Sequence, residues 1–100
     1  MSYRSRFSTK ETDELFEAIL TLKTVGDCYR FFEDLCTIKE IQEMSMRLNV
    51  AKMLDKKISY QKIIEETTAS SATISRVAKS LTYGASGYKI VLDELEKKEQ

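Results

Sequence analysis

The absence of proline is the feature that most limits what this chain can fold into. Glycine is nearly as rare, with only Gly26, Gly84 and Gly87 among 100 residues. Proline and glycine are the residues that most often interrupt a helix, so the segments between these positions can form unbroken helices. The length is that of one small domain. We therefore expect a single all-α domain over residues 1–100.

Apolar residues recur with helical spacing in six segments, and most of them begin with a recognisable capping residue. Ser8 to Glu11 and Thr37 to Glu40 both have the capping-box pattern, while Asp27 and Ser59 are good N-cap residues. The third helix is expected to end near residue 56, the fourth near residue 67 and the fifth at Tyr83, just before Gly84. The sixth should span about residues 87–98.

The third predicted helix, residues 38–56, is apolar on two nearly opposite sides. One side carries Ile41, Met44, Leu48 and Ala51, and the other carries Met46, Val50 and Met53. A helix that is apolar on both sides is normally buried on both, and a 100-residue monomer has little protein to cover them. The pattern favours a homodimer. The alternative is that the first, second and sixth helices cover this helix within one chain.

The net charge is zero, but the charge is unevenly distributed along the chain. Residues 39–82 hold eight basic and five acidic side chains, whereas residues 10–38 hold three basic and seven acidic ones. The attraction to nucleic acid depends on a local basic patch rather than on the total charge. The charge distribution is therefore compatible with DNA binding through residues 39–82.

Residues 59–83 have the pattern of a helix-turn-helix, with two short helices around a polar break at residues 67–71. Apolar or small residues at Ile63, Thr67, Ala69, Ile74 and Val77 should pack the two helices together. The opposite side of the second helix offers Ser71, Ala72, Thr73, Ser75, Arg76, Lys79 and Ser80. Short side chains at a helix N-terminus can enter the major groove, and the two cations can meet phosphates or guanine edges. The alternative is a pair of surface helices with solvated charges.

From Thr37 to Leu81 the sequence resembles the tryptophan repressor family. The matching stretches are Leu35 to Glu40, Arg47-Leu48, Leu54 to Ser59 and Ala72 to Arg76, and Ser80 to Gly84 resembles the Firmicute branch in particular. The resemblance implies a six-helix, intertwined homodimer that binds double-stranded operator DNA. By position it implies DNA contacts at Ser70, Ser71, Ala72 and Thr73, and backbone contacts at Gln61 and Lys62.

The resemblance also implies an effector site, in which an indole ring lies between two arginines matched here by Arg47 and Arg76. Thr37 and Ser80 match neighbouring polar positions. Guanidinium groups stack on aromatic rings and bind carboxylates, although Arg47 also has the spacing for an ion pair with Glu43. The family has glycine after the second arginine, and the β-branched Val77 here should crowd the pocket. Tryptophan, another small effector and no effector all stay open.

The sequence thus predicts a sequence-specific DNA-binding transcriptional regulator, most simply a repressor, located in the cytoplasm. An enzyme is not expected, because the chain lacks histidine, a glycine-rich phosphate loop and paired carboxylates. Without histidine or a Cys-x-x-Cys pair, a zinc site is not expected either. No apolar segment long enough for a membrane span is found. The alternative function is a helical, dimeric protein-interaction module that has lost DNA binding, which the acidic pair Glu65-Glu66 would suit.

Overall fold

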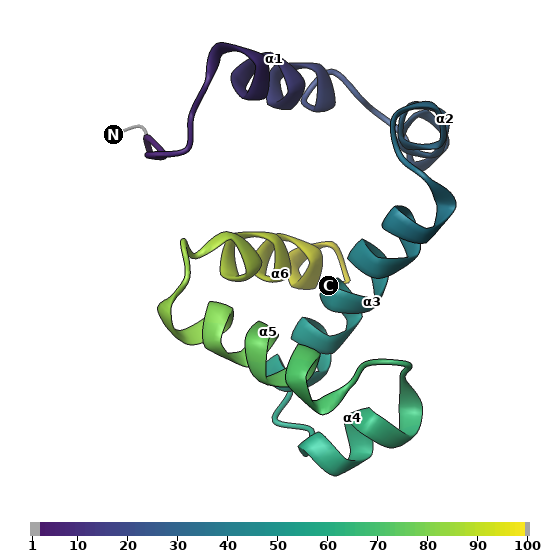
Figure 1. Ribbon diagram of the computed structural model, residues 1–100, viewed down its shortest axis with the longest axis vertical. Helices are drawn as coiled ribbons and strands as arrows, with labels where there is room; N and C mark the ends of the chain where they lie inside the picture. The colour runs from purple at the N-terminus through teal and green to yellow at the C-terminus, as the bar shows by residue number, and fades with distance from the viewer. Residues whose placement is uncertain (1–2, 100) are drawn as a thin grey trace. The chain divides into compact units, whose positions relative to one another are not determined.

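The computed structural model describes residues 3–99, which form six helices and no strand (Figure 1). The helices are α1 (Lys10–Ile19), α2 (Val25–Leu35), α3 (Ile38–Asp55), α4 (Tyr60–Glu66), α5 (Ser71–Tyr83) and α6 (Gly87–Lys98). The expected all-α, six-helix order is confirmed. Within this part of the chain, no helix is both long and apolar enough to cross a membrane. The described residues form two compact units, one ending at Ile38 and the other starting at Lys39. The extent of the domain stays a prediction.

The first unit contains α1 and α2, and the capping residues expected for both helices are wrong. Thr9, not Ser8, caps α1, and Thr24, not Asp27, caps α2, each by accepting a backbone N–H bond of 3.0 Å. The Ser8 hydroxyl instead donates to the Asp13 carboxylate at 2.8 Å. Asp27 lies inside the first turn of α2, where its negative charge interacts favourably with the positive end of the helix dipole. In both places a neighbouring threonine supplies the cap.

The first unit has little core of its own. Neither α1 nor α2 contains a buried residue. Phe31 and Phe32 of α2 form an edge-to-face pair with ring centres 5.7 Å apart, yet both side chains are only half-buried. Large apolar side chains such as Leu20, which is 82% exposed, are left in contact with solvent. The first unit therefore buries little apolar surface of its own.

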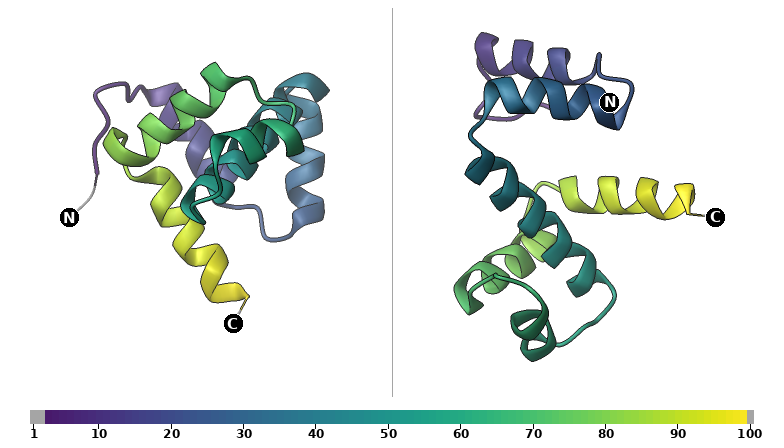
Figure 2. Two further views of the ribbon diagram at one scale, coloured as in Figure 1. Left: turned by 90° about the horizontal axis from the view of Figure 1, so that it is seen from below. Right: turned by 90° about the vertical axis from the view of Figure 1, so that its right-hand side faces the viewer.

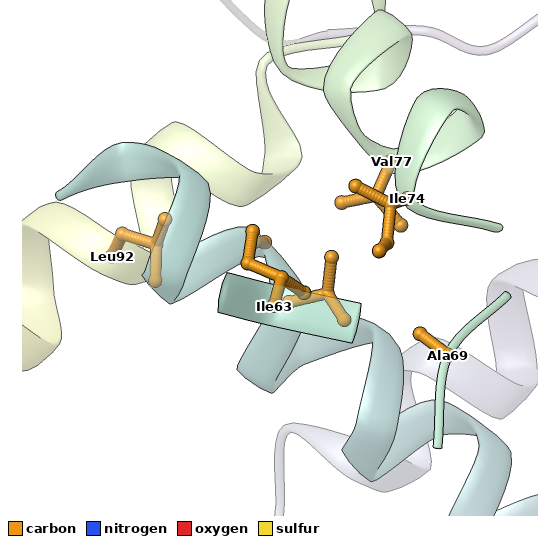
Figure 3. Packing of buried hydrophobic residues seen from close by; sticks show 7 residues of the cluster. Ile63, Ala69, Ile74, Val77 and Leu92 are labelled. Carbon is orange, nitrogen blue, oxygen red and sulfur yellow. The ribbon is translucent and has the colours of Figure 1, made fainter. Parts of the chain in front are cut away.

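The second unit has one apolar core, to which four helices contribute (Figure 3). Its buried members are Val50, Ala51, Ile63, Ala69, Ile74, Val77 and Leu92. They come from α3, α4, the α4–α5 turn, α5 and α6. α5 contacts both α4 and α6, so it lies at the centre of this unit (Figures 1 and 2). The core therefore fixes the position of α5.

The same core corrects the interpretation of α3. Val50 and Ala51 belong to the two opposite apolar sides of this helix, yet both are fully buried within the chain. Met46 and Leu48, again one from each side, pack partly buried against the same cluster. A partner subunit is not needed to cover this half of α3, because α4, α5 and α6 do so. Of the helices named in the single-chain alternative, α6 contributes a buried residue, Leu92.

A tight reversal between α3 and α4 sets the start of the helix-turn-helix. Lys57 has a φ of 64°, in the left-handed region that usually takes glycine. The Ile58 N–H donates to the Met53 carbonyl at 3.1 Å, and the Lys57 N–H donates to the Leu54 carbonyl at 3.0 Å. These two bonds form the Schellman motif that ends a helix. Ser59 follows directly as the N-cap of α4.

Gly84 ends α5 as expected, but the reason is space rather than a left-handed backbone. Its φ is −80°, which any residue can adopt. A Cβ atom at this position would collide with the backbone carbonyl of Ser80. That carbonyl also accepts the Gly84 N–H at 2.9 Å, so the two backbone segments are held in contact. Glycine is therefore required by the close approach of the chain to the last turn of α5.

Candidate nucleic-acid interface

Local hydrogen bonds define both ends of α4. The Ser59 hydroxyl accepts the Lys62 N–H at 3.2 Å, as its N-cap position predicted. At the other end, the Thr67 hydroxyl donates to the Ile63 carbonyl at 2.8 Å and accepts the Ala69 N–H at 3.1 Å. One threonine side chain thereby closes the helix and shapes the turn that follows. This leads the chain directly to the start of α5.

The N-terminus of α5 is capped by Ser70. Its hydroxyl accepts the Thr73 N–H at 3.1 Å and lies 3.1 Å from the Thr73 hydroxyl. The first turn of α5 contains no acidic residue, so the positive end of the helix dipole is not neutralised within that turn. Ser70 is one of the residues expected to contact DNA. Its side chain is already used to build the helix.

The predicted packing between the two helices is confirmed. Ile63 and Ile74 are fully buried, Ala69 and Val77 are buried, and Thr67 is half-buried. Figure 3 shows Ile63 from α4, Ala69 from the turn and Ile74 and Val77 from α5 within this core. Because Ile74 and Val77 are three residues apart, they lie on one side of α5 and direct its other side away from the core.

The side of α5 away from the core carries the residues predicted to contact DNA. Its small or polar members Ser71, Ala72, Ser75 and Ser80 are exposed, as are Arg76 and Lys79, and Thr73 is half-buried. On α4, Gln61 and Lys62 are exposed as well. All eight predicted DNA-contacting residues are therefore at least partly accessible in this unit. Their contacts with DNA stay predictions.

Two acidic residues on α4 pair with the predicted contacts, and the sequence interpretation did not assign them this role. The Gln61 side-chain amide donates to Glu65 Oε2 at 3.2 Å. The Lys62 ammonium lies 3.7 Å from Glu66 Oε1. The signal was present in the sequence, because residues four apart on a helix are neighbours.

Three of the four predicted effector residues lie in the second unit. Arg47 is half-buried on α3, whereas Arg76 and Ser80 are exposed on α5. Thr37 belongs to the first unit. A shallow, largely apolar hollow of about 550 Å³ lies beside Ser80, and neither Arg47 nor Arg76 is among its lining residues. The hollow is lined by Leu48, Ser80, Gly84, Ala85, Gly87, Tyr88 and Val91.

The surroundings of Arg47 and Arg76 bear on the predicted effector site. Val77, which follows Arg76, is 2% exposed and belongs to the apolar core rather than to an open pocket. Ion pairs join Lys62 to Glu66, Lys89 to Asp93 and Lys97 to Glu94, whereas the alternative pairing of Arg47 with Glu43 is not formed among residues 3–99. Arg47 and Arg76 therefore keep their guanidinium groups out of ion pairs within the described chain.

In this protein two short helices pack together through an apolar core. The second helix is capped by a hydroxyl and carries small, polar and basic residues on its exposed side. These features define a helix-turn-helix protein. The family model described as Trp repressor protein matches residues 10–96. YerC of Bacillus subtilis strain 168, itself named as uncharacterised, is 53% identical over 90 residues, which are 90% of this chain and 86% of YerC. The chain belongs to the Trp repressor family, whose members are DNA-binding regulators.

Solved structures confirm the fold. The crystal structure of a candidate Trp repressor from Staphylococcus aureus has a TM-score of 0.87 and 48% sequence identity, and the match covers 91% of each chain. The crystal structure of a TrpR-like protein from Eubacterium eligens has the same TM-score of 0.87 and 49% identity, covering 91% of this chain and 94% of that one. The Trp-repressor-like helix order expected from the sequence is thus confirmed.

Proposed function

We propose that this protein is a sequence-specific transcriptional repressor that binds operator DNA with α5. The observation that carries the proposal is the division of α5 into two sides. Ile74 and Val77 anchor one side in the core, and the exposed side bears Arg76 and Lys79 behind a capped N-terminus of short side chains. A recognition helix needs this combination, because bulk or acidity at its N-terminus would keep it out of the major groove.

The roles of the contact residues follow from their lengths and charges. Ser71, Ala72 and Thr73 are short enough to approach base edges, and the Thr73 methyl suits the methyl group of thymine. We assign phosphate contacts to Lys79 on α5 and to Gln61 and Lys62 on α4, because their side chains are exposed and can donate hydrogen bonds. Phosphate contacts supply most of the affinity, whereas base contacts supply the sequence preference.

We further propose that the repressor acts as an intertwined homodimer. The support is the amount of apolar surface left exposed outside the core of the second unit. Leu20 is 82% exposed, and Ile90 on α6 is 63% exposed. A second copy of the chain is the simplest cover for such surface. Two copies of α5 would then read two half-sites about 34 Å apart on an approximately palindromic operator.

For the effector, we propose that L-tryptophan binds weakly or not at all. Val77 supports this, since a buried valine occupies the position at which the family's glycine leaves room beside the second arginine. Whether another small molecule controls the protein is left to a ligand screen, in which the hollow beside Ser80 is the first place to look.

The test is selection from a pool of random DNA duplexes, followed by a salt titration on the selected sequence. A repressor of this type should enrich a palindrome. Its affinity should fall linearly with salt on a double logarithmic scale, with a slope of about −0.9 for each neutralised phosphate. A properly folded protein that enriches no sequence and binds no duplex at low salt would contradict the proposal.

That contrary result would favour the second candidate, a protein-interaction module that has lost DNA binding. The specific observation for it is the pairing of both α4 contact residues, Gln61 and Lys62, with carboxylates. Carboxylates beside a DNA-facing surface repel phosphate. The two candidates therefore assign different effects to these carboxylates, namely weaker DNA binding in a repressor and loss of DNA binding in an interaction module.

A further inference from the structure

The two α4 residues predicted to contact the DNA backbone are adjacent in sequence. The side chain of each is paired with a carboxylate that lies one helical turn further along the chain. Gln61 donates to Glu65 at 3.2 Å, and the Lys62 ammonium lies 3.7 Å from the Glu66 carboxylate. The side chains of Lys62 and Glu66 are 57% and 50% exposed, so both ends of this ion pair are accessible.

An ammonium group that faces a carboxylate cannot give its full attraction to a phosphate. When DNA approaches, Lys62 must either leave Glu66 or share its charge between the two anions. Exposed pairs of this kind are weak, worth about a twofold change in an equilibrium constant. Glu66 can therefore reduce the affinity for DNA without preventing binding.

We propose that Glu66 attenuates DNA binding by holding Lys62 back from phosphate. The inference rests on the proposed DNA-binding function and assigns an affinity-setting residue within the same interface. Because Lys62 is a phosphate contact rather than a base contact, the attenuation falls equally on operator and non-operator DNA. Base readout by α5 is unchanged.

The direct test compares the wild-type protein with Glu66→Gln on the selected operator and on a scrambled duplex, across a range of salt. Glutamine keeps the size and helix preference of the side chain but removes the charge. The variant should bind both duplexes about two- to threefold more tightly for each copy of α4 in the complex. Its salt slope should steepen by only part of the roughly 0.9 per copy that one full phosphate contact gives, because Lys62 already shares its charge with phosphate in the wild type.

Glu94→Gln is the matched control. It removes the same charge from a similarly exposed pair on α6, where Glu94 Oε1 lies 3.5 Å from the Lys97 ammonium. This variant should leave the affinity and the salt slope unchanged. An equal increase in both variants would overturn the proposal, because the effect would then come from net charge alone.

A double-mutant cycle shows whether Glu66 acts through Lys62. In a Lys62→Gln background the Glu66→Gln change should no longer increase affinity. If the increase persists without Lys62, Glu66 repels DNA directly and the proposed restraint is wrong. Thermal unfolding of all four proteins shows that each is folded.

The outcomes also separate this inference from the proposed function. If the wild type binds DNA and Glu66→Gln binds with the same affinity, the inference fails while the repressor proposal stands. If neither protein binds any duplex at low salt, the repressor proposal fails, and the inference fails with it. Binding by Glu66→Gln alone would support both, with a stronger attenuation than expected.

Discussion

The hydroxyl of Ser70 accepts the backbone N–H of Thr73 at 3.1 Å, so one predicted DNA contact caps the helix that carries five of the other seven. Position 70 therefore caps α5 and is also predicted to lie near phosphate. Substitutions at this residue can separate them, since a cap requires an acceptor oxygen and phosphate disfavours a negative one.

Replacing Ser70 with alanine should lower the free energy of unfolding by about 1 kcal/mol through loss of the cap. Ser70→Asp should keep most of the stability, because aspartate caps as well as serine, but should weaken binding to every duplex. Urea denaturation and a DNA titration measure the two effects. Ser75→Ala, at an exposed position in the middle of α5, is the control and should change stability little. Equal DNA affinity of Ser70→Asp and the wild type would show that position 70 is not part of the DNA interface.

Gly84 and Gly87 should respond in opposite ways to alanine. A Cβ at Gly84 would collide with the Ser80 carbonyl, so Gly84→Ala should cost about 1–3 kcal/mol as the end of α5 shifts. At Gly87, the first residue of α6, the added Cβ would meet no atom within 4 Å apart from its chain neighbours and the backbone of its own helix. Gly87→Ala should therefore be neutral or stabilise by up to about 1 kcal/mol. Thermal unfolding of the two variants gives the comparison, and equal losses would contradict it.

Val77 should behave as a core residue rather than as the wall of a ligand pocket. Val77→Ala should cost about 2–3 kcal/mol by leaving a cavity, and Val77→Gly about 1 kcal/mol more through helix propensity. The wild type should show weak or no binding of L-tryptophan in isothermal titration. Micromolar affinity would mean that the indole site exists despite the buried valine. A Val77→Ala protein of wild-type stability would show that the valine is not packed as described.

Lys79 should bind phosphate. Lys79→Ala should weaken binding to specific and scrambled duplexes alike and reduce the salt slope by about one charge per site.

Arg76→Ala distinguishes a phosphate contact from a contact with a guanine base. A phosphate contact gives the same uniform loss, whereas a guanine contact costs about 1–3 kcal/mol at one base pair and relaxes the preference only there. Lys97→Ala on α6 removes an equal charge as a control. If the folded Arg76→Ala and Lys79→Ala proteins bind DNA with wild-type affinity, α5 is not part of the DNA interface.

The protein should sediment at micromolar concentration as a species of about twice its chain mass of 11.5 kDa. Ile90→Glu tests the surface involved. In a lone chain this 63% exposed position should tolerate glutamate with little loss of stability, but in a dimer interface the charge should dissociate the subunits. Sedimentation equilibrium and circular dichroism measure mass and folding. A wild type that stays at 11.5 kDa throughout this range would rule out the homodimer.

The local features of the helix-turn-helix could be predicted from the sequence. Ser59 caps α4 as expected, and Ile63, Thr67, Ala69, Ile74 and Val77 pack the motif as their spacing predicted. These features depend on residues within a few positions of one another, so helical periodicity and side-chain chemistry specify them. The same reasoning was less accurate where two neighbouring residues could both supply a cap. Thr9 and Thr24 cap α1 and α2 in place of Ser8 and Asp27.

Only the tertiary structure decided what covers each apolar side chain. Both sides of α3 looked as though they required a partner, yet Val50 and Ala51 are buried by α4, α5 and α6 of the same chain. Periodicity tells which residues of a helix avoid water, but not which distant segment covers them. That depends on contacts between residues far apart in the sequence, which the folded chain alone brings together.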